Sequence, residues 1–277
     1  MIKPLDYFAS LVQQDDSIPL FEAAIALAQD IEPQLDLGAV QAEMDQLGAR
    51  LRKRVSADTG PIQKVQLLNQ YFYRELGFAS NLNNYYDPDN SYLHRVLKTR
   101  RGIPISLAML HIEMAQQIGL AVEGISFPGH FLLKLSVPSG DIIFDPVNGA
   151  SLSREELEDR LEPFVEQIRR VGKPLASYLE AAPARDILVR MLRNLKSLYL
   201  DRSRWQPLLD VQQRLLILLP NDISERRDRG LAFLHLDCPQ AALDDLQAYL
   251  AQRPYAADAE EVRRKLPMLR LACRRLN

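Results

Sequence analysis

The sequence predicts an α+β protein in which helices precede and follow a small antiparallel sheet. Residues 4–78 space apolar side chains at intervals of three and four, as helices do. Three short runs, 121–127, 130–136 and 141–145, are separated by Pro-Gly and Val-Pro-Ser-Gly turns, which is typical of an antiparallel meander. Such short turns argue against a parallel sheet. Helical spacing returns from about Arg154.

Three segments are expected to form an N-terminal helical lobe, namely 20–31, 37–55 and 60–78. Pro61 lies in the first turn of the third segment and Gly77 near its end, where these residue types are favoured. The polar stretch that follows, ASNLNNYYDPDNSYL, is rich in turn-forming residues.

The stretch RRGIPISLAMLHIEMAQQIGL predicts a buried helix with a tight entry. Gly102 and Pro104 lead into it, Ser106 lies in its first turn, and apolar residues follow almost continuously. A helix N-terminus favours negative charge, so nucleophiles are often placed there. Ser106 is therefore a candidate nucleophile. His111, surrounded by apolar helical neighbours, is expected to be a hydrogen-bonded core histidine.

His130 differs from the other histidines because it opens a strand directly after a Phe-Pro-Gly turn. If the hairpin loop is 137–140, Asp145 lies opposite Leu132 and points to the same face as His130. Backbones at that diagonal are about 7–8 Å apart, so imidazole and carboxylate can meet. A carboxylate and the imidazole that it orients supply two of the three members of a catalytic triad. A pair of this kind can equally brace two strands.

An anion-binding cleft is a further possibility at the entry to the buried helix. Arg100 and Arg101 precede the helix N-terminus, which favours anions such as a carboxylate of a partner. Asn84 and Asn148 could line the same cleft. A solvated loop and ordinary turn roles explain these four residues as well.

The C-terminal part of the chain repeats itself with a period of 34 residues, the spacing of tetratricopeptide helix pairs. The shift superposes Tyr199 on Phe233, Leu200 on Leu234, Leu209 on Leu243, Asp210 on Asp244, Leu216 on Leu250 and Pro220 on Pro254. We therefore expect two domains, 1–183 with its core at about 60–150, and 184–277 with helical repeats. A last helix at 256–276 would cap the repeats.

Charge divides the chain in the same way. The whole chain of 277 residues has a formal net charge of −2, which does not favour nucleic acid or an anionic membrane. Residues 1–183 carry −7 and residues 184–277 carry +5. This asymmetry indicates an acidic partner for the second domain, or a solvated helical array that is rich in arginine.

Targeting, metal and cofactor signals are lacking in the sequence. Cys238 and Cys273 have no metal-ligand spacing, and no phosphate-binding loop occurs, so we expect no metal and no cofactor. The first residues do not resemble a signal peptide, and no apolar run approaches the roughly 20 residues that span a bilayer. A cytoplasmic protein without a membrane segment is predicted.

Three segments resemble the transglutaminase-like domain of a bacterial family that is loosely described as regulatory or uncharacterised. They are YLHRVLKTRRGIPISLAMLHIEMAQQIGL, GISFPGHFLLKL and IIFDPVNGA. The tetratricopeptide-like tail matches that family too, so the resemblance spans roughly 5–270. Ala150 replaces the last glycine of the FDPxNGG-like motif. The resemblance implies a papain-like core.

By this resemblance His130 and Asp145 match the family's His and Asp, and Ser106 stands at or near the place of the catalytic Cys. No residue between 81 and 150 is a cysteine. A serine hydroxyl needs a well-placed base and an oxyanion hole to act as a nucleophile. We therefore expect a catalytically degenerate core that, with its tail, binds another protein or peptide as a regulatory module. The alternative is a Ser-His-Asp hydrolase or acyl transferase acting on a peptide or amide.

Overall fold

The computed structural model describes residues 3–164 and 174–276, and the chain divides into two compact units. One unit runs from Leu11 to Met191. The other combines Met1–Ser10 with Leu192–Asn277. Nearly all of the first helix, α1 (Pro4–Leu11), therefore belongs with the C-terminal helices and not with the helices that follow it in sequence.

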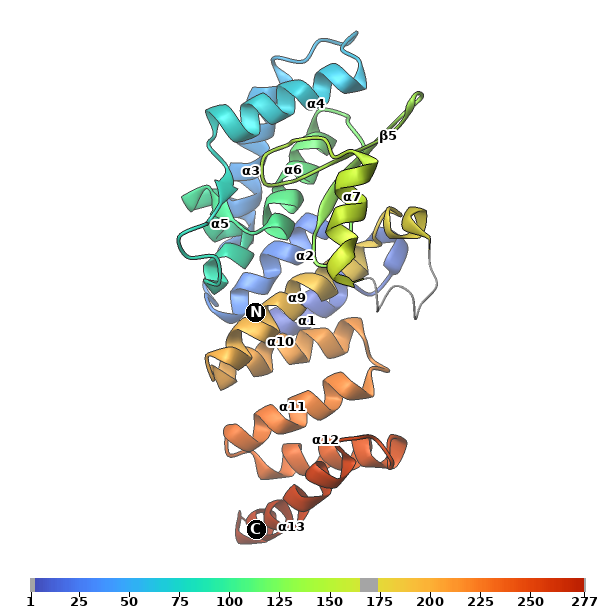
Figure 1. Cartoon of the computed structure of the whole chain (residues 1–277). Coiled ribbons are helices and arrows are strands. Elements are labelled where there is room, and N and C mark those ends of the chain that lie inside the picture. The colour runs from blue at the N-terminus through green and yellow to red at the C-terminus, as the bar shows by residue number, and fades with distance from the viewer. Residues whose placement is uncertain (1–2, 165–173, 277) are drawn as a thin grey trace. The chain divides into compact units, whose positions relative to one another are not determined.

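Short helices build the first half of the Leu11–Met191 unit (Figure 1). They are η1 (Asp15–Ser17), α2 (Leu20–Ala26), η2 (Leu27–Asp30), α3 (Leu37–Arg52), α4 (Pro61–Asn69), η3 (Gln70–Glu75), η4 (Pro88–Ser91) and α5 (Leu93–Thr99). Asp36 begins α3 by accepting a hydrogen bond from the Ala39 N–H. The helix expected at 60–78 changes type, because α4 continues into the π-helical η3. Such turns often mark functional sites.

Helix α6 (Pro104–Gln117) is the central element of this unit. Every residue from Ile105 to Ile112 is buried, as the continuous apolar sequence predicts. The helix contacts α2, α3, α4 and α5, and also β3 (Val122–Ile125) and β4 (Leu132–Val137). It therefore fixes the position of its first turn, which includes Ser106, relative to the sheet.

The sheet is the expected antiparallel meander, in the order β3-β4-β5, with β5 at Gly140–Phe144. Leu133 pairs with Phe144, so the next position along each strand places Leu132 opposite Asp145. Helix α7 (Arg154–Leu161) packs on the sheet. The shared core consists of Ile125, Phe127, Leu132, Ile143, Leu157 and Leu161.

The remaining elements of this unit are short. Strand β1 (Ala79–Ser80) pairs in parallel with β2 (Arg101–Gly102), a contact between distant segments that the sequence pattern does not indicate. Two 3-10 turns follow α7, η5 (Glu162–Phe164) and η6 (Leu175–Tyr178).

Helical hairpins form the C-terminal unit. The helices are α9 (Ala184–Asp201), which enters this unit at Leu192, α10 (Trp205–Leu218), α11 (Ile223–His235), α12 (Pro239–Gln252) and α13 (Ala259–Leu276). Helix α12 begins and ends 34 residues after α10 does, and α11 ends 34 residues after α9. This is the spacing that the internal repeat predicts.

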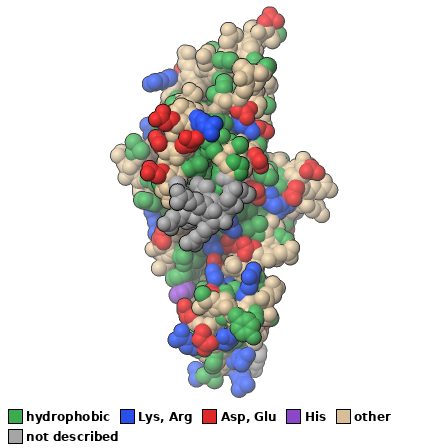
Figure 2. Space-filling model, turned by 45° about the vertical axis from the view of Figure 1, so that its right-hand side comes forward, with side chains coloured by type: hydrophobic (Ala, Val, Ile, Leu, Met, Phe, Trp, Pro, Cys, Tyr) green, Lys and Arg blue, Asp and Glu red, His purple; other side chains and the backbone are tan. Residues whose placement is uncertain are grey.

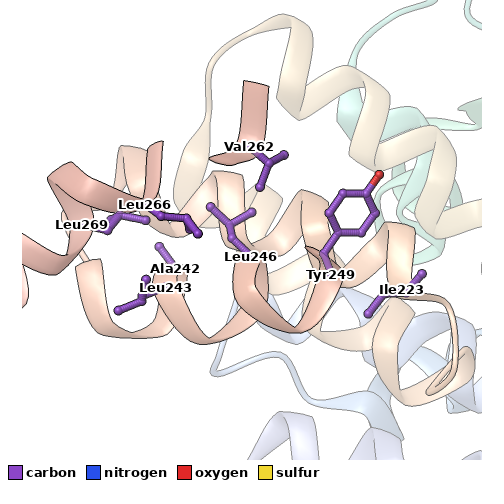
Figure 3. Close-up of a cluster of buried hydrophobic side chains, with 8 residues drawn as sticks. All are labelled: Ile223, Ala242, Leu243, Leu246, Tyr249, Val262, Leu266 and Leu269. Atoms are coloured by element: carbon purple, nitrogen blue, oxygen red, sulfur yellow. The ribbon is translucent and has the colours of Figure 1, made fainter. Parts of the chain in front are cut away.

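Apolar side chains of α12 and α13 interlock in the core of this unit (Figure 3). The buried cluster contains Ile223, Ala242, Leu243, Leu246, Tyr249, Val262, Leu266 and Leu269. At the other end of the repeats, the buried guanidinium of Arg214 lies over the ring of Phe8 in α1, with Cζ 4.8 Å from the ring centroid. A cation held over an aromatic face is attracted to it, so this contact ties α1 to α10.

None of the helices in the described residues combines the length and apolarity needed to cross a membrane.

Candidate functional site

Ser106 lies inside the protein, at the entry to α6, and its side chain is fully buried. Its hydroxyl oxygen accepts a hydrogen bond from the Ile103 N–H at 3.0 Å. The hydroxyl donates to the backbone oxygen of Asn90 at 2.6 Å. A Cβ added to Gly102 would lie 2.7 Å from the Ser106 hydroxyl oxygen. Ser106, at the third position of the helix, thus satisfies the N–H of the N-cap residue Ile103 and ties the turn-rich loop to the helix.

Both carboxylate oxygens of Asp145 already have partners. One accepts the Val147 N–H at 2.9 Å, which shapes the turn after β5. The other accepts a hydrogen bond from Arg160 of α7 at 2.9 Å, in a partly buried ion pair. Asp145 therefore joins the sheet to α7.

His130 lies two residues before β4, after Gly129 in a left-handed conformation. Burial lowers the pKa of His130, and the positive charges of Arg160 and Arg190 lower it further. The negative charge of Asp145 acts in the opposite direction and raises this pKa. Asp145 is thus close enough to act on the imidazole electrostatically. However, among the hydrogen bonds of residues 3–164 and 174–276, none joins two members of the set Ser106, His130 and Asp145.

A buried polar cluster behind the 145–150 loop was missed in the sequence. His111 is fully buried and its Nε2 lies 2.8 Å from Asn69 Oδ1. The Asn69 amide in turn donates to the Gly149 carbonyl at 3.2 Å. Tyr73, in the π-helical η3, donates to the Pro146 carbonyl at 2.9 Å. These bonds hold the 145–150 loop independently of the ion pair between Asp145 and Arg160.

The spacing of Asn69 and Tyr73, four residues apart on one helix face, was the available signal for this cluster. Burial, and then the charge of Asp145, raise the pKa of the Tyr73 hydroxyl, which therefore stays protonated and donates its hydrogen bond. His111 is the buried, hydrogen-bonded core histidine that its apolar neighbours predict.

The two arginines before α6 make contacts within the protein. Arg100 adopts a left-handed conformation at the end of α5, and its guanidinium lies over Phe78, 4.7 Å from the ring centroid. It also lies 3.6 Å from Glu43. Arg101 donates to the Gly77 carbonyl at 2.7 Å. The structure directs both side chains toward α3 and the β1 segment.

The two asparagines lie in different turns. Asn84 donates from its amide to Asp87 at 2.7 Å, in the exposed loop before η4. Asn148 accepts the Ala150 N–H at 2.9 Å, within the turn that follows Asp145. Both side chains make local turn bonds.

A cavity of about 390 Å³ opens in the C-terminal unit, between helices α9, α10, α11 and α13. Its lining includes the exposed Leu200 and the rings of Trp205 and His235, which stack with centroids 3.6 Å apart. Gln212 is 1% exposed, and its side-chain oxygen has no hydrogen-bond partner in the described residues. A buried carbonyl oxygen without a donor is costly, so this oxygen destabilises the packing behind the cavity wall.

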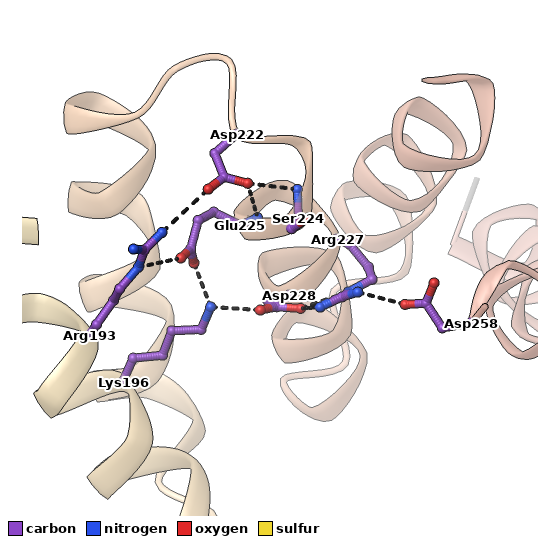
Figure 4. A network of polar contacts seen from close by, with 8 residues as sticks. All are labelled: Arg193, Lys196, Asp222, Ser224, Glu225, Arg227, Asp228 and Asp258. Carbon is purple, nitrogen blue, oxygen red and sulfur yellow. Dashed lines mark hydrogen bonds and ion pairs between the residues drawn. The ribbon is translucent and has the colours of Figure 1, made fainter. Parts of the chain in front are cut away.

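Charged side chains beside this cavity are joined in one network (Figure 4). Glu225, which is nearly buried, accepts from Lys196 at 2.5 Å and from Arg193 at 3.3 Å. Lys196 also reaches Asp228 at 2.6 Å, and Arg227 continues the chain to Asp258. The network links α9 to α11 and to the start of α13, so it fixes the walls of the cavity.

Within the described residues, no group of three or more His, Cys, Asp or Glu side chains is arranged to hold a metal ion.

Comparison with known proteins separates the chain into the same two parts. A model of the transglutaminase-like superfamily matches residues 38–193, and a tetratricopeptide-repeat model matches residues 195–267. No solved structure matches the chain.

Curated relatives match along nearly the whole chain. A UPF0162 protein of Xylella fastidiosa (strain Temecula1) is 40% identical over 250 residues, covering 90% of this chain and 89% of the relative. A UPF0162 protein of Vibrio cholerae is 31% identical, covering 88% and 90%. Protein SirB1 of Salmonella typhimurium is 27% identical, covering 91% and 93%. The chain, in which a transglutaminase-like domain is followed by tetratricopeptide repeats, therefore belongs to the transglutaminase-like superfamily and, within it, to the bacterial UPF0162 family.

Proposed function

We propose that this protein is a protein-interaction module with a regulatory role, built on a transglutaminase-like core that no longer catalyses acyl transfer. The cavity between α9, α10, α11 and α13 carries the proposal, because it offers a partner segment an apolar wall and an aromatic stack. Tetratricopeptide repeats generally bind protein segments, which supports a protein or peptide as the ligand.

The environments of Ser106 and Asp145 support the proposal that the core no longer catalyses acyl transfer. Ser106 is fully buried and its hydroxyl is used in a helix cap, so it has neither access to substrate nor a bond to a base. The partners of the Asp145 carboxylate are Arg160 and the Val147 N–H, and in the described residues no hydrogen bond joins it to His130.

Leu200→Glu is expected to reduce capture of the partner at least about tenfold, because it places a charge in the apolar wall of the cavity. Leu200 is 50% exposed, so the fold should tolerate the change. The measurement is quantitative affinity capture with the full chain, compared between wild type and variant. Tyr255→Glu is the matched control, since Tyr255 is 96% exposed in the same unit and does not line the cavity. Equal enrichment with wild type and Leu200→Glu would contradict the proposal.

A Ser-His-Asp hydrolase or acyl transferase is the second candidate, and one observation favours it: Asp145 lies near enough to His130 to oppose the lowering of its pKa. A fluorophosphonate probe separates the two candidates. We expect no labelling of the full chain under conditions where a control serine hydrolase reacts. Labelling that Ser106→Ala abolishes and His130→Ala strongly reduces would establish the enzyme instead.

Ser106→Ala has its own expected result if the hydroxyl is structural. The variant should lose about 1–2 kcal/mol of unfolding free energy, because the Ile103 N–H loses its nearer acceptor and the Asn90 carbonyl loses the hydroxyl donor. Chemical denaturation followed by circular dichroism measures this. An unchanged midpoint would mean that the buried bonds of Ser106 contribute little.

A further inference from the structure

The outward face of α13 exposes apolar side chains. Met268 is 61% exposed and Leu271 is 52% exposed. Arg264 and Arg275 lie at the helical spacing that places them on the same face, and both are exposed. We call these four residues the α13 face.

The α13 face also carries positive charge that the rest of the unit does not neutralise. Several other arginines of the unit are paired with carboxylates; Asp245, for example, binds both Arg226 and Arg229. On α13, Arg263 and Lys265 pair with the two glutamates of the first turn. In the described part of the chain, Arg264, Arg270, Arg274 and Arg275 form no ion pair with a carboxylate. Lys and Arg side chains gather, with apolar ones among them, at the lower end of Figure 2.

We infer that the α13 face is a second docking surface, distinct from the cavity, and that its partner is an acidic amphipathic helix of another protein. The face extends over about 16 Å from Arg264 to Arg275, or three helical turns. A partner helix with apolar residues at a spacing of three or four and carboxylates beside them would cover Met268 and Leu271. Its carboxylates would meet the unpaired arginines, which steers association and selects the partner.

Charge argues against a second copy of this chain as the occupant. Two α13 helices facing each other would bring their arginine-rich halves into one interface, and the glutamates at the start of each helix already have partners. Two exposed apolar residues per copy are also far too few to bury the roughly 1,200 Å² of a stable dimer. An acidic helix instead removes both the apolar exposure and the excess charge.

The test uses the full chain and designed peptides of about 18 residues. One peptide carries leucines at helical spacing flanked by glutamates, and its counterpart has lysine in place of every glutamate. Fluorescence anisotropy should detect binding of the acidic peptide only. Its affinity should fall by about tenfold or more between about 50 and 300 mM salt, because the contacts are exposed ion pairs.

Two double variants locate the site. Arg264→Glu with Arg275→Glu, and Met268→Ala with Leu271→Ala, should each weaken binding of the acidic peptide about tenfold or more. Both pairs are exposed, so folding should be preserved. Arg253→Glu changes an exposed arginine of the same unit outside the face and should leave binding unchanged.

Four outcomes would overturn the inference. Equal affinity of wild type and the face variants would do so, as would loss of binding in Leu200→Glu alone, which would place the peptide in the cavity. A dimer in sedimentation that Leu271→Glu dissociates would show a second copy as the occupant. Binding to phosphatidylglycerol vesicles without binding of the acidic peptide would show a membrane surface. Failure of the Leu200→Glu prediction leaves this inference standing, since the two sites share no residue.

Discussion

Gly149→Ala is expected to lower the free energy of unfolding by about 3 kcal/mol. The position has a left-handed backbone conformation, and its neighbours leave no room for a side chain. Gly149 has a φ of +73°, where a side chain costs about 1–2 kcal/mol. An added Cβ would lie 2.6 Å from Tyr73 Cε2 and 2.8 Å from Asn69 Nδ2. These are the side chains that hold the loop bearing Asp145, so the substitution disrupts the loop as well as the packing. Urea denaturation measures the loss.

Gly77→Ala is the matched control for this prediction. Gly77 has the same φ of +73°, but nothing lies within 4 Å of an added Cβ. It should therefore lose only the backbone contribution, about 1–2 kcal/mol. The difference between the two variants reports the packing of Asn69 and Tyr73 against the loop. Equal losses would mean that these two side chains yield without cost, and that the cluster does not fix the loop.

Most of the fold was predicted from the spacing of apolar residues along the sequence, because this spacing indicates which face of each helix or strand is buried. The three strands, the buried α6 and the 34-residue spacing of the C-terminal helices were all expected and are all observed. The parallel pair β1–β2 and the grouping of α1 with the C-terminal helices were not expected. Both depend on contacts between segments far apart in the chain, which no local pattern records.

The candidate site was harder to predict for the same reason. The hairpin register that puts Asp145 opposite Leu132 was expected and is observed, since a hairpin register is a local property. The partner of Asp145 is Arg160, and that of Ser106 is the backbone of Asn90, 16 residues earlier. A motif specifies which residues share a site, whereas hydrogen bonding to the surrounding chain decides what each of them does.

His111 should make the protein sensitive to acid. Burial lowers the pKa of His111 from 6.5 to about 3 in the folded state. In the unfolded chain the imidazole binds a proton near pH 6.5, so below that pH the unfolded state gains protons that the folded state does not. The stability that this histidine contributes is complete above pH 6.5 and falls by about 1.4 kcal/mol per pH unit as the pH drops toward 3.

The surroundings of the ring explain why the folded state resists the proton. Asn69 donates its amide hydrogen to Gly149, so its oxygen faces His111 and accepts the Nε2 proton. The other nitrogen, Nδ1, is buried and has no partner in the described residues. Phe72, Tyr73 and Phe144 surround the ring at centroid distances of 5.4, 6.1 and 5.4 Å. A second proton would therefore be a buried charge without an acceptor.

His111→Gln isolates this effect, because glutamine can donate to Asn69 but does not titrate. Between pH 7.5 and 4.5 the wild type should lose about 3 kcal/mol more unfolding free energy than the variant, as measured by urea denaturation at each pH. Comparing the pH dependence of the two proteins removes both the effect of carboxylates and any constant cost of the substitution. Parallel profiles would show that His111 accepts a proton in the folded protein, and that the cluster behind the 145–150 loop is open to water.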